Sequence, residues 1–237
     1  METTYSPRFA VLVAAFNEEG RIYDTVAAAA LVPGVVGVIV ADDGSRDATV
    51  KAAVSAGASV VCNTRNLGKG AAMELAAAAL EEQPFGALDG VLLLDGDLGS
   101  SASAASELLK PLIANTADLV IGILPSPPGK AGFGLAQSLG REGILKYGNG
   151  FEARAPLSGQ RALTLDCLER IRPFADGYCM DVALTICALQ QGQRVVEVPV
   201  EMQHRATGRN LGGFLHRGRQ YFQIKRLLTA YDKQNMR

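Results

Sequence analysis

Two aspartates separated by a single glycine, in the segment Asp95-Gly96-Asp97, directly follow the most apolar run of the chain. Carboxylates this close repel each other unless a cation or solvent screens them. Hard oxygen ligands favour Mg²⁺ or Mn²⁺, and such an ion commonly completes its coordination with substrate phosphates. A solvated turn is the alternative, because Asp-Gly is a common turn dipeptide. The pair by itself is compatible with both interpretations.

The sequence holds two histidines, and one of them lies in a basic segment. His204 is followed directly by Arg205 and, a few residues later, by Arg209. An imidazole in such a segment is better suited to contact a ligand or a phosphate than to fill a core, and guanidinium groups pair well with diphosphate oxygens. A surface position is the alternative, because His216 also adjoins an arginine.

Two further charged residues stand where helices are expected to begin. Lys69 lies between glycines before an alanine-rich helical pattern, where backbone N–H groups and a lysine favour a phosphate, although an ordinary turn is the commoner outcome. Asp181 opens a later helix. It could accept a proton from an attacking hydroxyl, or only complement the helix dipole.

Adjacent acids also end the second apolar run, at Asp42 and Asp43. Helix capping by Ser45 or Asp47 explains part of this acidic turn. It does not explain two adjacent carboxylates at a strand end, which can accept hydrogen bonds from a nucleotide base or from ribose hydroxyls.

These residues follow a regular alternation of short apolar runs and helical patterns. The predicted strands are 9–15, 35–41, 59–62 and 90–94, and the predicted helices are 18–31, 47–56 and 70–82. Such alternation predicts an α/β fold with a mostly parallel, Rossmann-like sheet flanked by helices. Ligands bind beyond the carboxyl ends of such strands. We therefore expect one edge of the sheet to collect Asn17, Asp42, Asp43, Asp95 and Asp97.

The second half of the chain is less regular. Its predicted strands are 119–124 and 194–200, and its predicted helices are 137–148, 181–191 and 214–231. A Pro/Gly-rich loop is expected at 125–134. Neither an internal repeat nor a low-complexity linker is visible. We expect a single domain over 1–237.

Composition excludes several classes of protein. Hydrophobic residues make up 48% and charged residues 20%, which is typical of a globular domain. The four cysteines form no C-x-x-C pair, so neither a disulfide framework nor a structural zinc site is expected, and a reducing, cytoplasmic compartment fits best. No targeting segment or membrane-spanning helix is expected.

The formal net charge of −1 conceals a basic end: residues 205–237 hold eight Lys and Arg against one acid. A basic, amphipathic helix in this region can lie on an anionic membrane surface as a peripheral anchor, or it can pack its apolar stripe on the domain. Nucleic-acid binding is not expected, because the total charge is slightly negative and no nucleic-acid motif is present.

Taken together, these segments resemble family 2 glycosyltransferases of the GT-A fold. The matching segments are VLVAAFNEEGRI at 11–22, VIVADDGSRDAT at 38–49, NLGKGAAM at 66–73, LLLDGDL at 92–98, APLSGQRAL at 155–163, GYCMDVAL at 177–184 and VPVEMQHRATGR at 198–209. The resemblance extends to polyprenyl-phosphate sugar transferases and to glucosyl-3-phosphoglycerate synthases. It implies an inverting, metal-dependent transfer of a sugar from a nucleotide diphosphate donor.

The resemblance also implies a role for each matching residue. Asp97 and His204 would hold the Mn²⁺ or Mg²⁺ ion, and Asp181 would be the general base. The nucleotide-sugar would contact Ala14, Asn17, Glu19, Asp43, Lys69, Asp95, Gly96, Arg205 and Arg209. The acceptor side would include Ser158, Gly159 and Gln160, with the loop at 125–134 as its lid. The nucleotide-sugar-binding half would be 1–100, and the acceptor-binding half would be 101–237.

One position departs from the family pattern. The general base commonly follows another acid, whereas here Met180 precedes Asp181. A phosphate acceptor is already anionic and hardly needs a base, so the acceptor can be a hydroxyl or a phosphate, including a lipid-linked one.

UDP-sugars are the default donors, with GDP-mannose open. A catalytically idle sugar-nucleotide-binding module or regulatory protein is the alternative function.

A dinucleotide oxidoreductase is excluded, because A-F-N-E-E-G replaces the glycine-rich fingerprint after the first strand. A phosphoacceptor signalling domain could use acidic strand ends, but it would leave His204-Arg205 unexplained.

Overall fold

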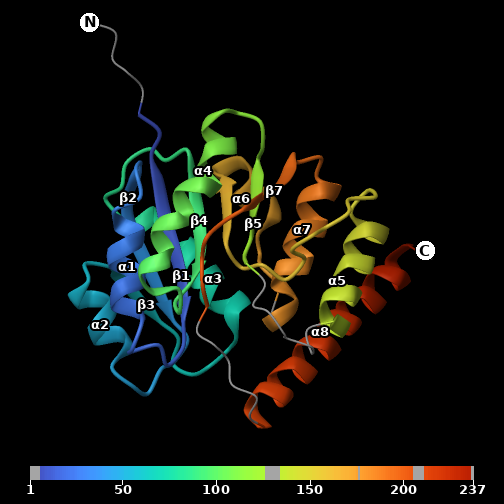
Figure 1. Cartoon of the computed structure of the whole chain (residues 1–237), viewed down its shortest axis with the longest axis horizontal. Helices are drawn as coiled ribbons and strands as arrows, with labels where there is room; N and C mark the ends of the chain where they lie inside the picture. The colour runs from blue at the N-terminus through green and yellow to red at the C-terminus, as the bar shows by residue number, and fades with distance from the viewer. Residues whose placement is uncertain (1–5, 126–133, 176, 205–210, 236–237) are drawn as a thin grey trace, which may run out of the picture.

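The computed structural model describes residues 6–125, 134–175, 177–204 and 211–235. Within these ranges seven strands form one sheet in the order β3-β2-β1-β4-β6-β5-β7 (Figure 1). The strands are β1 Phe9–Ala15, β2 Val35–Asp42, β3 Ser59–Cys62, β4 Gly90–Asp95, β5 Leu119–Ile123, β6 Arg161–Thr164 and β7 Val195–Pro199. Only β6 runs antiparallel to its neighbours, β4 and β5. The predicted, mostly parallel α/β sheet is confirmed.

Helices cover both faces of this sheet. One face is packed by α1 Ile22–Ala30, α2 Thr49–Ser55, the 3₁₀ segment η2 Gly99–Ala105 and α4 Ser106–Ile113. The other face is packed by α3 Lys69–Ala78, α6 Leu165–Ile171 and α7 Met180–Gln190. The strands are therefore buried on both sides, which explains their nearly continuous apolar sequence. Two further 3₁₀ segments are η1 Ala79–Glu82 and η3 Gly177–Cys179.

A third apolar cluster joins α7 to α5 Gly134–Tyr147 and α8 Leu211–Asn235. Ile224 and Leu228 of α8 are buried in it, and the rings of Tyr147 and Tyr231 stack with centroids 5.2 Å apart. The described part of the apolar stripe thus packs on the domain, which is one of the two alternatives that the sequence left open for the basic end. Among the described residues, no helix is both long and apolar enough to span a bilayer.

Some elements differ from the sequence prediction. The first helix begins at Ile22 and not at Glu18, because residues 18–21 form a turn in which Arg21 N–H donates to the Glu18 carbonyl. The elements β6, α4 and α6 were not predicted. Strand β6 contains a polar residue, Arg161, and α4 contains Pro111, so neither shows a clean apolar pattern.

Candidate active site

The strand ends expected to collect acidic residues do meet at one edge of the sheet. Ala15 at the end of β1 pairs with Asp42 of β2, and Ala14 pairs with Asp95 of β4. Asp97 lies two residues beyond β4. This edge therefore brings the acidic turns of β2 and β4 next to the end of β1.

The turn after β4 is held in place by α1. The Thr25 hydroxyl, fully buried, donates to the Gly96 carbonyl at 2.9 Å and accepts from Gly99 N–H at 2.7 Å. A side chain at Gly96 would come within 3.2 Å of the Ala14 carbonyl oxygen. A larger residue between the two aspartates would therefore press on β1, which would have to shift by a few tenths of an ångström. Sequence reasoning missed Thr25, which is not charged and lies in an ordinary helical pattern.

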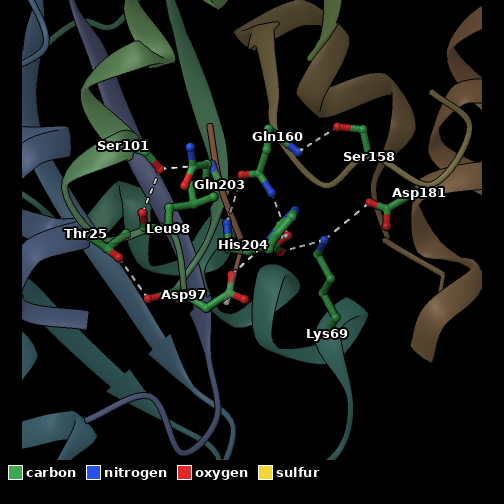
Figure 2. Close-up of polar contacts among 12 residues, drawn as sticks. Thr25, Lys69, Asp97, Leu98, Ser101, Ser158, Gln160, Asp181, Gln203 and His204 are labelled. Atoms are coloured by element: carbon green, nitrogen blue, oxygen red, sulfur yellow. Dashed lines mark hydrogen bonds and ion pairs between the residues drawn. The ribbon is translucent and has the colours of Figure 1, made fainter. Parts of the chain in front are cut away.

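Asp95, Asp97 and His204 form the cluster expected of a metal site. Figure 2 shows the side chains of Asp97 and His204 pointing toward each other. One ligand atom from each lies within 4.8 Å of the others, and His204 Nδ1 is 2.9 Å from Asp97 Oδ1. Burial favours the neutral imidazole of His204. The hydrogen bond to Asp97 and the charge of Asp95 have the larger effect, and the pKa of His204 is raised above its ordinary value. Two carboxylates and one imidazole at this spacing fit Mn²⁺ or Mg²⁺, with room for other oxygen ligands.

Asp95 also has partners on the side away from Asp97. Lys69 Nζ lies 2.8 Å from its Oδ1, and Gln160 Nε2 donates to its Oδ2 at 2.6 Å. Burial favours the neutral acid, but Lys69 and His204 outweigh it and hold the pKa of Asp95 below its ordinary value. Because both of its oxygens are already engaged, Asp95 is less available to a metal ion than Asp97.

Lys69 connects this cluster to the candidate general base. Its Nζ also lies 3.5 Å from Asp181 Oδ1. Figure 2 shows the Lys69 and Asp181 side chains pointing toward each other. The carboxylates of Asp181 and Asp95 overcome the effect of burial and raise the pKa of Lys69 above its ordinary value. The lysine therefore stays charged between two acids that come from α7 and β4.

Asp181 is buried near the start of α7, and burial raises its pKa despite the nearby cations Lys69 and Arg161. Arg161 is fully buried beneath it. The guanidinium donates to the Asp181 carbonyl at 2.8 Å, to Thr185 Oγ1 at 2.9 Å and to the Ser158 carbonyl at 2.9 Å. Sequence reasoning missed Arg161, although an arginine inside APLSGQRAL was a visible signal.

Residues 158–160 lie against the Lys69–Asp95 pair. A Cβ atom on Gly159 would be 2.1 Å from Lys69 Nζ and 2.8 Å from Asp95 Oδ2. Gln160, predicted on the acceptor side, contacts Asp95 through its side-chain amide. The short segment before β6 thus shapes the space between the metal cluster and Asp181.

The acid predicted to face the base has its carboxylate turned to the protein. Asp43 accepts hydrogen bonds from the backbone N–H groups of Leu67 and Gly68 and from Asn63 Nδ2, at 2.7–2.9 Å. It fixes the loop that leads into α3 and Lys69. Its contact with a nucleotide base stays a prediction.

The predicted nucleotide residues after β1 tie two loops together. Asn17, with φ of 56°, accepts from Arg46 N–H through its side chain, and Glu19 accepts from Ala48 N–H. Both side chains bind the loop after β2. Arg205, Arg209 and residues 126–133 of the predicted lid lie outside the described residues.

A seven-stranded sheet of this order, with a carboxylate–imidazole cluster and a buried acid at one edge, defines the GT-A class of glycosyltransferase folds. The chain belongs to glycosyl transferase family 2, whose model matches residues 10–159.

Individual relatives agree with this assignment. The chain is 28% identical over 201 residues to glycosyltransferase AglJ of Haloferax volcanii, covering 84% of this chain and 64% of that protein. The chain thus spans somewhat less than two thirds of that relative's length.

A crystal structure of glucosyl-3-phosphoglycerate synthase from Mycobacterium tuberculosis with phosphoglyceric acid matches with a TM-score of 0.74 and 25% identity, covering 92% of this chain and 78% of that one. A structure of the same enzyme with Mn²⁺, UDP and phosphoglyceric acid has a TM-score of 0.75 and 24% identity, covering 94% and 78% of the two chains. These likenesses support the fold.

Proposed function

We propose that this chain transfers a sugar, with inversion, from a nucleotide diphosphate donor to a hydroxyl or phosphate acceptor. The observation that carries the proposal is the placement of the Asp95–Asp97–His204 cluster beside Asp181, with Lys69 between them. A metal-binding group next to a buried acid provides what transfer from a diphosphate needs: stabilisation of the leaving group and a site for proton removal.

Asp97 and His204 are the residues that would hold the ion, because they bring a carboxylate and an imidazole to within 2.9 Å of each other. Both oxygens of Asp95, in contrast, contact Lys69 or Gln160. When bound, Mn²⁺ or Mg²⁺ would neutralise negative charge on the leaving diphosphate. Asp95 and Lys69 would bind the ribose or the donor sugar from the other side. Structures of the Mycobacterium tuberculosis enzyme are complexes with Mn²⁺ and UDP or with Mg²⁺ and UDP, which supports the same ions and a UDP-sugar donor here.

Asp181 would accept the proton of a hydroxyl acceptor as the acceptor oxygen attacks the anomeric carbon. Attack from the face opposite the leaving diphosphate inverts that carbon. Lys69 at 3.5 Å can keep Asp181 ionised and can also contact an anionic acceptor. A phosphate acceptor would require no proton removal, so both acceptor classes belong to the proposal, including a lipid-linked one.

The single-domain organisation also belongs to the proposal. Strand β6, from the half assigned to the acceptor, pairs with β4 from the half assigned to the donor. Gln160 and His204 of the second half contact acids of the first half. The site is therefore built from both halves, and we expect 1–237 to unfold as one unit.

The first experiment is a thermal-shift screen of UDP, GDP and their sugar conjugates, each with and without Mn²⁺, followed by an assay for nucleotide release. A ligand that binds only the folded state raises the melting temperature. We expect a Mn²⁺-dependent shift with one nucleotide and release of that nucleotide on adding acceptor. A shift without any release, over a broad set of hydroxyl and phosphate acceptors, would favour the idle binding module.

A further inference from the structure

The outer side of α8 is a separate surface, which we define by Arg219, Phe222, Lys225, Arg226 and Lys233. All five side chains are exposed, and Phe222 is 69% exposed. Arg219, Lys225 and Arg226 lie three or four positions from Phe222, and Lys233 returns to the same side three turns later. One exposed aromatic ring is therefore flanked by three cations, and a fourth lies on the same side of the helix about 16 Å further along.

This cationic face has no acidic partner within the described part of the chain. Its four cations form no ion pair there, and the one acid of the described helix, Asp232, is bonded to Lys146 and Tyr147 of α5. Four residues of the described part of α8 lie on the opposite side, in the cluster shared with α5 and α7: Ile224, Leu227, Leu228 and Tyr231. Packing on the domain thus accounts for the apolar stripe of the helix but not for its cations or for Phe222.

The position of α8 places the helix near the candidate active site. A Cβ atom on Gly177 would lie 2.5 Å from the Gln223 side chain, and one on Gly68 would lie 3.3 Å from the Gly177 backbone. Gln223 adjoins Phe222 on the helix, and Gly68 precedes Lys69. Figure 1 shows α8 along the outer side of α5, at the end of the sheet opposite α2.

We propose that the cationic face of α8 docks on the surface of an anionic phospholipid bilayer, with Phe222 inserted among the headgroups. Lysine and arginine are attracted to anionic headgroups, and an aromatic side chain adds apolar contact at the interface. The face would orient the chain with its active site close to the lipid. The purpose of this docking, access to a lipid-linked acceptor, rests on the proposed function. Binding to the bilayer can be measured without turnover.

Charge distribution favours a bilayer over nucleic acid. Residues 1–204 hold 15 Lys and Arg against 23 Asp and Glu, so most of the chain is acidic. A flat anionic surface can contact α8 alone, whereas a long nucleic acid would also meet the acidic remainder. An exposed phenylalanine among cations suits the apolar boundary below the headgroups.

The test is flotation of the full chain with vesicles of phosphatidylcholine alone or with about 30% phosphatidylglycerol, a content that gives a negative surface potential. We expect binding to the anionic vesicles only, and its loss at about 1 M NaCl, where the Debye length is about 3 Å. Absence of binding to anionic vesicles, or equal binding to both compositions, would overturn the proposal. So would tighter binding to a DNA duplex than to the vesicles at the same salt concentration.

Paired variants locate the surface. Lys225→Gln/Arg226→Gln should weaken vesicle partitioning about 25-fold, at about five-fold per cation. The control Lys51→Gln/Lys110→Gln removes the same charge from exposed positions on α2 and α4, and it should bind as the unchanged chain does. Equal loss in both variants, or in neither, contradicts docking through α8.

Two further readouts separate this inference from the proposed function. Phe222→Ser should weaken binding to anionic vesicles without changing the melting temperature, because the ring is exposed. The Mn²⁺-dependent nucleotide shift should be the same in all these variants. A chain that binds vesicles but shifts with no nucleotide would refute the proposed function and leave the docking surface standing.

Discussion

The imidazole Nδ1 of His204 lies 2.9 Å from Oδ1 of Asp97, although 107 positions separate the two residues. Asp97 follows β4 in the middle of the sheet, and His204 follows β7 at its edge. After β7 the chain returns across the carboxyl edge, where Val200 and Met202 are buried and Gln203 N–H donates to Ser101 Oγ. That return path builds the candidate metal site.

The first prediction concerns this pair. Asp97→Asn should lower metal-dependent transfer by about 10³-fold or more, because loss of the ion removes several kcal/mol of charge stabilisation. Chelation of metal from the unchanged chain should have the same effect, and Mn²⁺ should restore only the unchanged chain. The measurement is nucleotide release at saturating donor, with Mn²⁺ binding followed by calorimetry.

Exposed acids provide the control for Asp97→Asn. Asp166 is paired with Arg170 on α6. Asp166→Asn should leave both the rate and Mn²⁺ binding unchanged. If Asp97→Asn retains its full rate with Mn²⁺, the metal assignment is wrong.

The second prediction concerns Asp181. Asp181→Asn should keep the nucleotide-induced thermal shift and lower transfer to a hydroxyl acceptor by about 10²–10⁴-fold, the usual contribution of a general base. Because burial raises the pKa of Asp181, the rate of the unchanged chain should fall as pH drops through that raised pKa, when the carboxylate becomes protonated. The variant should lack this acid limb. Full transfer by the variant would instead identify a phosphate acceptor.

The sequence predicted the positions of the acids at the strand ends better than the contacts that hold the site together. Short apolar strands that end in acids identify the carboxyl edge, because the apolar run of each buried strand and the acids that follow it are adjacent in the sequence. Arg161 could not be placed in this way. Its contacts with Asp181 and Thr185 depend on β6, a four-residue antiparallel strand whose polar sequence resembles a loop.

Asp43 shows a second limit of the sequence. Its position at the end of a strand is correctly predicted, but the pattern cannot show that its carboxylate accepts from Leu67 and Gly68 N–H groups. Such a partner depends on how the loop before α3 returns over β2. Position in a parallel sheet is a local property, whereas the direction of a side chain depends on distant segments.

The third prediction concerns the glycine beside the Lys69–Asp95 pair. Gly159→Ala places a methyl group where Lys69 Nζ lies, so the lysine must move away from Asp95 and Asp181. We expect the rate of transfer to fall about 10²-fold, the effect of a displacement of about 1 Å at a reacting centre. Steady-state kinetics and crystal structures of the variant would measure this.

A double-variant cycle tests whether Gly159 acts through Lys69. Gly159→Ala combined with Lys69→Met should be no slower than Lys69→Met alone, because the second change removes the group that the first displaces. Gly218→Ala is the matched control, since a Cβ there meets no atom within 4 Å. Additive losses would mean that the methyl group acts on Asp95, whose Oδ2 it would approach to 2.8 Å, or on the substrate, and not through the lysine.

The last prediction concerns stability. Glu74 of α3 accepts from Arg172 Nη2 at 2.7 Å and from Phe174 N–H at 3.1 Å, which ties α3 to the segment after α6. Burial acts to raise the pKa of Glu74, but these hydrogen bonds outweigh it and lower that pKa. Glu74→Gln should therefore cost about 1 kcal/mol in the free energy of unfolding at neutral pH, after allowance for solvent screening.

The pH dependence of that difference gives the sharper test. The stabilisation by Glu74 is fully present above the ordinary glutamate pKa of 4.5 and is lost as pH falls through the lowered pKa of the folded chain. Urea unfolding of the two chains should thus show a gap at neutral pH that closes in acid. Glu107→Gln, which removes an exposed pairing with Lys110, should show no gap at either pH. A gap for Glu74→Gln that persists in strong acid would show that the carboxylate charge is not its cause.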